Sequence, residues 1–295
     1  MACYACTSHD DCLNGRTCNQ GLCVDPPPDD GGPWIDLPDA GPDITPYREL
    51  LGDRLFADFN TAYMITEDDR SPPSMGADAG RALRVRDGSG FGRHLHVSNI
   101  PQLQPTMARR SINEGPLRTV VRFGPGSWAD LGVDYRRTGL VEGGYLLVFR
   151  VDPSRMDVWS PATATDLIFV NNIGPGNNGS GVGSIWLSQT DTGIILTGGQ
   201  YISLTRGDLI ELADWAVLAV KYDAQGQHVT LNGVTLASFA SSLEGQPEQN
   251  RIRIRQNGTT DETFDLARFI IWTGSVTNDE LTQLTRTAID EYDLR

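Results

Sequence analysis

The sequence predicts an all-β protein in which one antiparallel β-sandwich, residues 47–295, ends in a short C-terminal helix and follows a small disulfide-rich segment. Short apolar or alternating runs, each broken by Gly, Asn, Asp or Pro, fill most of the large region, and such spacing is typical of a sandwich. Helical spacing of apolar residues is clear near the C-terminus, and all five cysteines lie within the first 23 residues. The chain therefore divides into a head, residues 1–24, a spacer, residues 25–46, and the sandwich.

The head is too short and too polar to bury an apolar core, so cross-links or a metal must stabilise it. The nearly even spacing of its later cysteines favours disulfides, and four cysteines allow three pairings that the sequence leaves open. The disulfide candidates are Cys6, Cys12, Cys18 and Cys23. Zinc is the alternative, because Cys3 and Cys6 have ligand spacing and His9 lies near them, but no second close pair follows.

The pattern Cys-x5-Cys-x5-Cys-x4-Cys of the head resembles small secreted knots of myxobacterial and other bacterial surface proteins. The resemblance implies an extracellular or cell-surface location. Cys3 is then left over, and we expect a free thiol, an intermolecular bridge or the lipidated cysteine of a lipoprotein. No signal peptide is visible, so either a leader has been removed or the protein leaves the cell by another route, such as lysis with a virion.

The spacer contains seven of the 17 prolines of the chain, interspersed with Asp and Gly. Proline fixes φ and removes a hydrogen-bond donor, so neither a helix nor a sheet can propagate through this stretch. Like-charged Asp residues extend it further. Two interpretations stay open, a stalk that holds the sandwich away from an anchor and a disordered tether.

The strands of the sandwich are predicted from their periodicity. Leu117–Phe123 alternates apolar and polar residues, as a half-buried strand does, whereas residues 145–151 are apolar at nearly every position, as a central strand would be. Further strands are predicted at residues 167–170, 184–187, 193–196, 201–204, 215–222, 228–231, 251–255 and 266–272.

Two local signals fix the turns of this region more sharply. Asn232 and Gly233 stand between two apolar runs and predict a two-residue hairpin, because both residues tolerate positive φ. Thr277 and Glu280 predict the capping box of a helix. Apolar residues follow at helical spacing, namely Leu281, Leu284, Ala288, Ile289 and Tyr292.

Three motifs resemble concanavalin A-like, LamG-type jelly rolls. They are Trp215 followed by Val220-Lys221-Tyr222-Asp223 and Val229-x-Leu231-Asn232-Gly233, the loop Asp87-Gly88-Ser89-Gly90-Phe91-Gly92-Arg93-His94, and Phe269-Ile270-Ile271-Trp272 before the C-terminal helix. The resemblance implies that residues 47–295 form two antiparallel sheets, often with a structural calcium ion and a glycan- or surface-binding role. The same family includes glycoside hydrolases and polysaccharide lyases.

Charge and hydropathy exclude several partners. The chain carries 28 Asp and 10 Glu against 23 Arg and one Lys, for a net charge of −14. This balance argues against nucleic acid and against an anionic membrane surface, and no apolar run approaches the ~18 residues of a membrane helix. Abundant Asp suits calcium, a salty medium or simple solubility. We expect calcium at turns, with Asp58 and Asp87 as the candidate ligands.

Catalytic residues are not evident. Glycoside hydrolysis needs two carboxylates that face one bond, and none of the ten Glu residues stands in such a pattern on a predicted strand. Arg251, Arg253 and Arg255 share one face of a predicted strand, where they form either an anion-binding row or a solvated surface. We therefore expect no enzyme activity, with a polysaccharide hydrolase or lyase as an alternative.

Glycan binding needs aromatic rings for stacking and amides for hydroxyl groups. An amide- and glycine-rich segment with a tryptophan shortly after it, and a second tryptophan in a loop, meet this need. The candidate ligand-binding residues are Asn171, Asn172, Asn177, Asn178, Trp186 and Trp128. Two functional hypotheses follow, a surface-displayed module that binds a glycan or cell-surface polymer, and a self-assembling subunit of a virion, fibre or filament.

Overall fold

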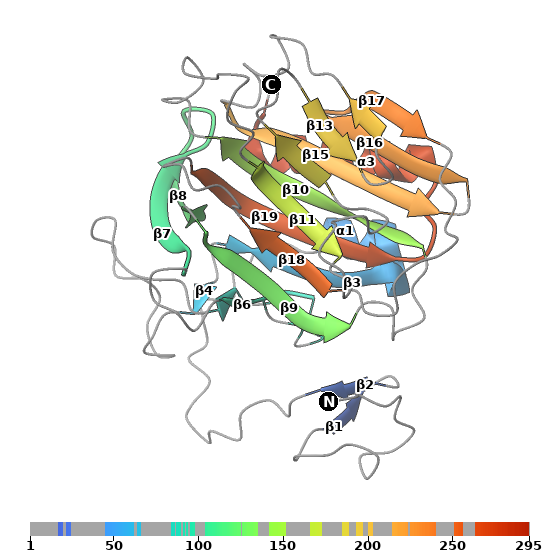
Figure 1. Cartoon of the computed structure of the whole chain (residues 1–295), viewed down its shortest axis with the longest axis horizontal. Helices are drawn as coiled ribbons and strands as arrows, with labels where there is room; N and C mark the ends of the chain where they lie inside the picture. Colours follow the sequence, from blue (N-terminus) through green and yellow to red (C-terminus); the bar gives the residue numbers. More distant parts are fainter. Residues whose placement is uncertain are drawn as a thin grey trace.

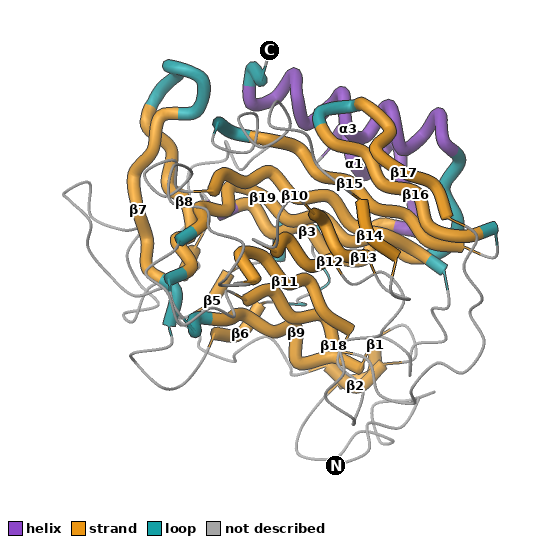
Figure 2. Tube along the Cα trace, turned by 45° about the horizontal axis from the view of Figure 1, so that its top comes forward, coloured by secondary structure: helices purple, strands orange, loops and turns teal. Residues whose placement is uncertain are grey.

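A computed structural model describes residues 17–19, 22–24, 45–61, 64–65, 84–85, 87–89, 91, 93, 95–97, 104–124, 126–134, 142–151, 166–172, 185–188, 193–196, 200–202, 214–223, 225–239, 251–255 and 263–294. In this part of the chain, two large antiparallel sheets are stacked, and a helix near the C-terminus lies over one of them (Figures 1 and 2). The predicted all-β sandwich with a short C-terminal helix is therefore confirmed.

The first large sheet has eight strands in the order β17-β16-β15-β10-β19-β8-β7, with β3 also paired to β19. Its strands are β3 (Leu55–Asn60), β7 (Thr106–Ser111), β8 (Leu117–Phe123), β10 (Gly143–Val151), β15 (Ala216–Asp223), β16 (Gly226–Leu231), β17 (Val234–Phe239) and β19 (Phe264–Thr273). Sequence neighbours pair only at the hairpins, and β10 pairs with β19 although a long stretch of chain separates them.

The second large sheet has nine strands in the order β14-β13-β12-β11-β18-β9-β6-β5-β4. Its strands are β4 (Met64–Ile65), β5 (Arg84–Val85), β6 (Leu95–Val97), β9 (Trp128–Asp134), β11 (Asp166–Asn172), β12 (Ile185–Ser188), β13 (Gly193–Leu196), β14 (Gln200–Ile202) and β18 (Arg251–Arg255). A separate two-stranded sheet in the head pairs β1 (Thr17–Asn19) with β2 (Leu22–Val24).

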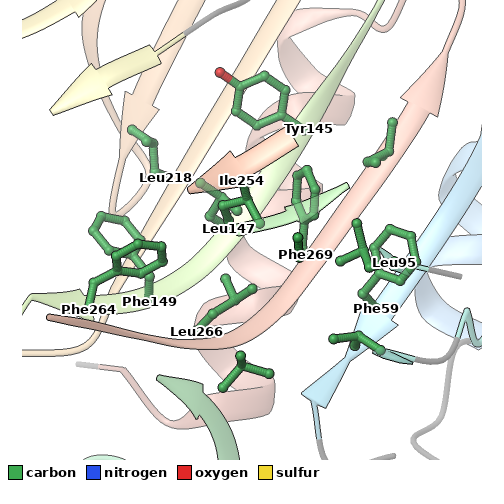
Figure 3. Close-up of a cluster of buried hydrophobic side chains, with 14 of the residues drawn as sticks. Phe59, Leu95, Tyr145, Leu147, Phe149, Leu218, Ile254, Phe264, Leu266 and Phe269 are labelled. Carbon is green, nitrogen blue, oxygen red and sulfur yellow. The ribbon is translucent and has the colours of Figure 1, made fainter. Parts of the chain in front are cut away.

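The main core fills the space between the two large sheets. Phenylalanine side chains of β3, β10 and β19 meet there (Figure 3), and the rings of Phe123 and Phe264 stack with their centroids 4.6 Å apart. Ile254, Ala129 and Leu131 join this core from the nine-stranded sheet, so they mark the inward face of that sheet.

A second core lies on the outer face of the eight-stranded sheet. There α3 (Asn278–Tyr292) and α1 (Thr45–Leu51), which leads into the 3-10 turn η2 (Gly52–Arg54), cover the apolar side chains of β10, β15 and β19. Strand β10 is therefore buried on both faces, as predicted for residues 145–151. Trp215 and Trp272 are both buried in this second core. Neither helix in the described part of the chain has the length and apolar character of a membrane span.

Both local turn predictions are confirmed. Asn232 and Gly233 join β16 to β17 with φ values of 49° and 81°, which matches a turn with positive φ at both central residues. Helix α3 begins after Thr277, whose side chain accepts a hydrogen bond from the Glu280 backbone N–H, while the Glu280 carboxylate accepts one from the Thr277 N–H.

The Glu280 carboxylate also binds Arg54 on η2, with an Nη2–Oε1 distance of 2.5 Å. The hydrogen bonds from Arg54 and from Thr277 lower the pKa of Glu280 from 4.5 to about 2. A carboxyl group whose pKa falls on folding stabilises the native state above its unfolded pKa and loses that effect as the pH falls toward the folded pKa. The ion pair of Arg54 and Glu280 should therefore weaken between about pH 4.5 and pH 2.

We expect Glu280→Gln to lower the free energy of unfolding by about 0.5–1 kcal/mol at pH 7, because the pair is partly exposed to solvent. The difference from the parent should shrink steadily as the pH falls below 4.5. Denaturant unfolding at a series of pH values measures it, with Glu49→Gln, at an exposed glutamate of α1, as the control. A difference that stayed constant from pH 7 to pH 2 would contradict the assignment.

Candidate functional site

The two outer faces of the sandwich differ in what covers them. Both helices of the described chain pack on the eight-stranded sheet, and α3 and α1 lie on the side away from β9, β11 and β18 (Figure 2). Among the described elements, no helix packs on the outer face of the nine-stranded sheet, so the outward strand positions of this face are the candidate site.

The strand register identifies the positions on that outer face. Ile254 and Ala129 are cross-strand partners that point into the core, and successive residues of a strand alternate between faces. Arg253 and Arg255 of β18 therefore occupy outer positions. Their partners on β9 are Asp130 and Trp128.

One row of outer positions crosses six strands from β9 to β14. Directly opposed partners make up this row, in the order Trp128, Arg255, Phe169, Trp186, Ile195 and Tyr201. Neighbouring strands lie about 4.8 Å apart, so the row extends about 24 Å across the sheet. We call these six residues the aromatic row.

A second row runs beside the aromatic row and is polar throughout. Its directly opposed partners are Arg84, His96, Asp130, Arg253 and Asn171. His96 is exposed, while Val85 and Leu95, the neighbours of this row in sequence, are fully buried in the main core. The outer face thus places aromatic residues beside basic residues, one acidic residue and one amide residue.

The structure brings together three of the six predicted ligand-binding residues. Asn171, Trp186 and Trp128 occupy outer positions on β11, β12 and β9, and the side chain of Trp128 is half-buried. Asn172 does not share this face. Its partner on β18 is Ile252, which adjoins the outward Arg253 and therefore takes an inward position, so Asn172 takes an inward position too. Asn177 and Asn178 lie outside the described residues.

Sequence reasoning did not select Phe169, Tyr201 or Ile195 for this face. These residues lie in predicted strands, and alternation along a strand indicates which of its residues share a face. Alternation alone does not show which strands pair with each other, so it could not bring the three residues together. Arg253 and Arg255 carried two interpretations, an anion-binding row or a solvated surface. Arg255 stands between Trp128 and Phe169 in the aromatic row, which favours the first interpretation, whereas Arg253 stands between Asp130 and Asn171 in the polar row.

The candidate calcium ligand Asp87 has protein donors on both carboxylate oxygens. Its Oδ1 accepts hydrogen bonds from the backbone N–H groups of Asp58, at 3.0 Å, and Ser89, at 2.9 Å. Its Oδ2 accepts from the Ser89 hydroxyl at 2.7 Å and from the Arg93 N–H at 3.0 Å. Asp87 therefore organises its own loop and joins it to β3.

The second calcium candidate, Asp58, forms a fully buried ion pair with Arg268. The Arg268 Nε and Nη2 atoms donate to the two Asp58 carboxylate oxygens at 2.9 and 2.5 Å, and both side chains are 0% exposed. Burial raises the pKa of the Asp58 carboxyl group, and the charge of Arg268 opposes that rise. A calcium ion at Asp58 would have to displace the guanidinium group.

These contacts assign Asp58 and Asp87 a structural role in the fold. In the described residues, no group of three or more His, Cys, Asp or Glu side chains is arranged to hold a metal ion. Calcium binding therefore stays a prediction from the sequence.

The disulfides of the head also stay a prediction, because Cys6 and Cys12 lie outside the described residues. Cys18 and Cys23 are directly opposed in the β1–β2 hairpin. Opposed residues of an antiparallel pair have Cα atoms about 4.5–5.5 Å apart, which is within the range of a disulfide. Of the three pairings, this register is compatible with the one that joins Cys18 to Cys23.

Comparison with known proteins identifies the fold but no family. No family model matches the chain, and no curated protein matches it. Among solved structures, it is similar to the botulinum neurotoxin serotype D binding domain, with a TM-score of 0.52, 13% identity and coverage of 81% of this chain and 53% of that chain. The binding domain of Paraclostridial Mosquitocidal Protein 1 gives a TM-score of 0.51 with the same identity and coverage.

The botulinum neurotoxin serotype D ligand-binding domain in complex with N-acetylneuraminic acid matches with a TM-score of 0.50 and 14% identity, over 81% of this chain and 52% of that chain. The chain thus spans about half the length of each of these structures. At this low identity the similarity establishes a shared β-sandwich fold, and these structural neighbours are binding domains.

Proposed function

We propose that this protein is a non-enzymatic recognition module that binds a glycan on the outer face of its nine-stranded sheet. The observation that carries the proposal is the aromatic row, which aligns Trp128 and Trp186 across the sheet, with Asn171 in the row beside it. Ligand sites combine apolar and aromatic surface with a few polar groups, and these two rows supply both.

The chemistry of the two rows suits an acidic saccharide. Aromatic rings present apolar faces on which the C–H faces of sugar rings can stack. Arginine pairs with carboxylates through two parallel charge-assisted hydrogen bonds. Arg255 stands between Trp128 and Phe169 in the aromatic row, and Arg253 stands in the row beside it. An extended saccharide that carries carboxylates could lie along the whole row. Its sugar rings would stack on the aromatic residues, and its carboxylates would pair with the arginines.

The structural neighbours support a role in binding, because the similar structures are binding domains and one of them was solved with N-acetylneuraminic acid. The sequence resemblance to LamG-type jelly rolls supports the same class of ligand. The cysteine-rich head supports an extracellular or cell-surface location, where such glycans occur. Calcium dependence belongs to the proposal and is tested with it.

Trp128→Ala tests the aromatic row. We expect the variant to bind its glycan at least about fivefold more weakly than the parent, because the loss of a stacking ring removes about 1 kcal/mol or more of binding free energy. A broad glycan array, with calcium and with a chelator, identifies the ligand, and titration calorimetry measures the affinities. Leu117→Ala, at an exposed residue of the eight-stranded sheet, is the control and should bind as the parent does. Silence of the parent protein on the array would reject the function.

A second candidate, a self-assembling subunit, is favoured by the edge strand β17. This strand ends the eight-stranded sheet, carries no charged residue or proline in its sequence VTLASF, and exposes 65% of Val234. Natural edge strands are usually protected by charges or proline, so an edge strand that contains neither suits pairing with a second copy. Native mass measurement separates the two candidates, because a strict monomer that binds a glycan rejects assembly.

A further inference from the structure

Two of the three arginines of β18 stand opposite aspartates. Strand β18 lies between β9 and β11 (Figure 1). The opposed pairs on β9 and β18 are Asp134 with Arg251 and Asp130 with Arg253. Opposite charges at directly opposed positions stabilise an antiparallel strand pair. Arg251 and Arg253 therefore have a structural reason to stand on this strand, because they help to hold β18 against β9.

Arg255, the third arginine of β18, stands among aromatic residues instead. Its directly opposed partners are Trp128 on β9 and Phe169 on β11. The planar guanidinium group stacks on aromatic rings and still presents N–H groups at the edge of its plane. A carboxylate can accept two of these N–H groups in parallel. An arginine between two aromatic positions is therefore suited to an acidic ligand whose sugar rings stack on the same row.

Asp130 makes the polar row the less favourable place for an acidic group. It is directly opposed by Arg253 of β18 on one side and by His96 of β6 on the other. A ligand carboxylate beside Arg253 would therefore lie next to an aspartate, and juxtaposed like charges oppose binding. The six residues of the aromatic row include no acid. Of these two arginines, Arg255 is thus the better placed to receive a carboxylate.

The position of Arg255 within the aromatic row restricts the kind of acidic sugar. Trp128 stands on one side of Arg255, and Phe169 and Trp186 follow on the other. A saccharide that stacks along the row continues past Arg255 in both directions, so the acidic sugar is linked to a neighbour on each side. Uronic acids meet this requirement, because they carry a carboxylate on each sugar unit while the chain continues at both ends.

We propose that Arg255 makes the aromatic row selective for polysaccharides built from uronic acids, whereas Arg251 and Arg253 pair with aspartates of β9. This inference rests on the proposed function, and it narrows the acid-binding role to one arginine. A neutral saccharide would still stack on the aromatic residues. Arg255 therefore sets the preference for an acidic ligand, and the aromatic residues supply the binding that both kinds of ligand share.

Titration calorimetry of the full chain with two probes tests this assignment. The probes are hexagalacturonic acid and the neutral hexasaccharide obtained by reducing its carboxyl groups, which keeps the sugar rings and removes the charges. We expect the parent to bind the acid about tenfold more tightly than the reduced probe, because only the acid forms charge-assisted hydrogen bonds. Arg255→Gln should bind the two probes with nearly equal affinity. Arg286→Gln, which removes an exposed arginine of α3, should keep the preference of the parent.

Two further measurements separate selectivity from a structural role. Arg255→Lys keeps the charge but cannot form two parallel hydrogen bonds, so its preference for the acid should lie between those of the parent and Arg255→Gln. This variant decides the matter if Arg255→Gln does not fold. Denaturant unfolding of Asp130→Asn, Arg253→Gln and the double variant should give non-additive losses of stability, as expected for two residues that interact.

Three outcomes overturn the proposal. A parent protein that binds both probes equally removes the selectivity but leaves glycan binding in place. A folded Arg255→Gln variant that keeps the preference of the parent shows that another residue recognises the acid. Binding of neither probe excludes a uronic acid ligand, and the glycan array then decides separately whether the proposed function stands.

Discussion

Replacement of Arg268 by methionine is expected to lower the free energy of unfolding by about 3–5 kcal/mol, because it leaves the Asp58 carboxylate buried without a countercharge. Arg268 and Asp58 are both 0% exposed. The Arg268 Nη1 atom also donates to both oxygens of Glu291 on α3, at 2.6 and 2.7 Å, and its guanidinium lies over the Tyr47 ring of α1. One side chain thus joins β3, β19 and both helices.

Denaturant unfolding measures the effect, and a double variant isolates its cause. Asp58→Leu combined with Arg268→Met replaces both charges by apolar side chains, and such replacement of a whole buried pair is often tolerated. We therefore expect the double variant to be more stable than Arg268→Met alone. Glu291 is partly exposed, so water can solvate it in both variants. A single variant as stable as Arg286→Met, the exposed control on α3, would show that the buried pair is not important.

Gly144→Ala is expected to destabilise the protein by about 3 kcal/mol or more, because the added methyl group has no room. An ideal Cβ atom at Gly144 would stand 2.2 Å from the Val220 carbonyl oxygen and 2.3 Å from the Trp272 ring. The carbonyl belongs to β15 and the ring to β19, the two strands that pair with β10. Trp272 is fully buried, so neither neighbour can move without disturbing the centre of the sheet.

Thermal and denaturant unfolding measure this loss against Gly124→Ala. No atom lies within 4 Å of the Cβ position at Gly124, so the matched control removes the same backbone freedom without a clash. We expect it to change the free energy of unfolding by less than about 1 kcal/mol. Equal stability of the two variants would contradict the close packing of Gly144 beneath Trp272.

Some elements follow from the sequence because their causes lie within a few residues. The Asn232-Gly233 turn, the capping box of Thr277 and Glu280, and a strand at Leu117–Phe123 are each confirmed by the structure. The predicted alternation of that strand is wrong, because Leu117 is exposed while Val120 and Val121 are both buried. Predicted strands at residues 184–187 and 201–204 are each shifted by one or two residues, to Ile185–Ser188 and Gln200–Ile202. Strands β3, β7 and β9 and helix α1 were not predicted, because nonlocal packing and pairing stabilise such elements more than local propensity does.

The sequence by itself determined the fold class, the turn between β16 and β17, and the C-terminal helix. Only the tertiary structure decided which residues meet, since β18 pairs with β9 and β11 across long stretches of chain and Arg268 binds Asp58 from 210 residues away. The same register put Asn171 and Asn172 on opposite faces. The physical reason is that side chains alternate between faces at every residue, so the composition of a face depends on the register of strands that lie far apart in the sequence.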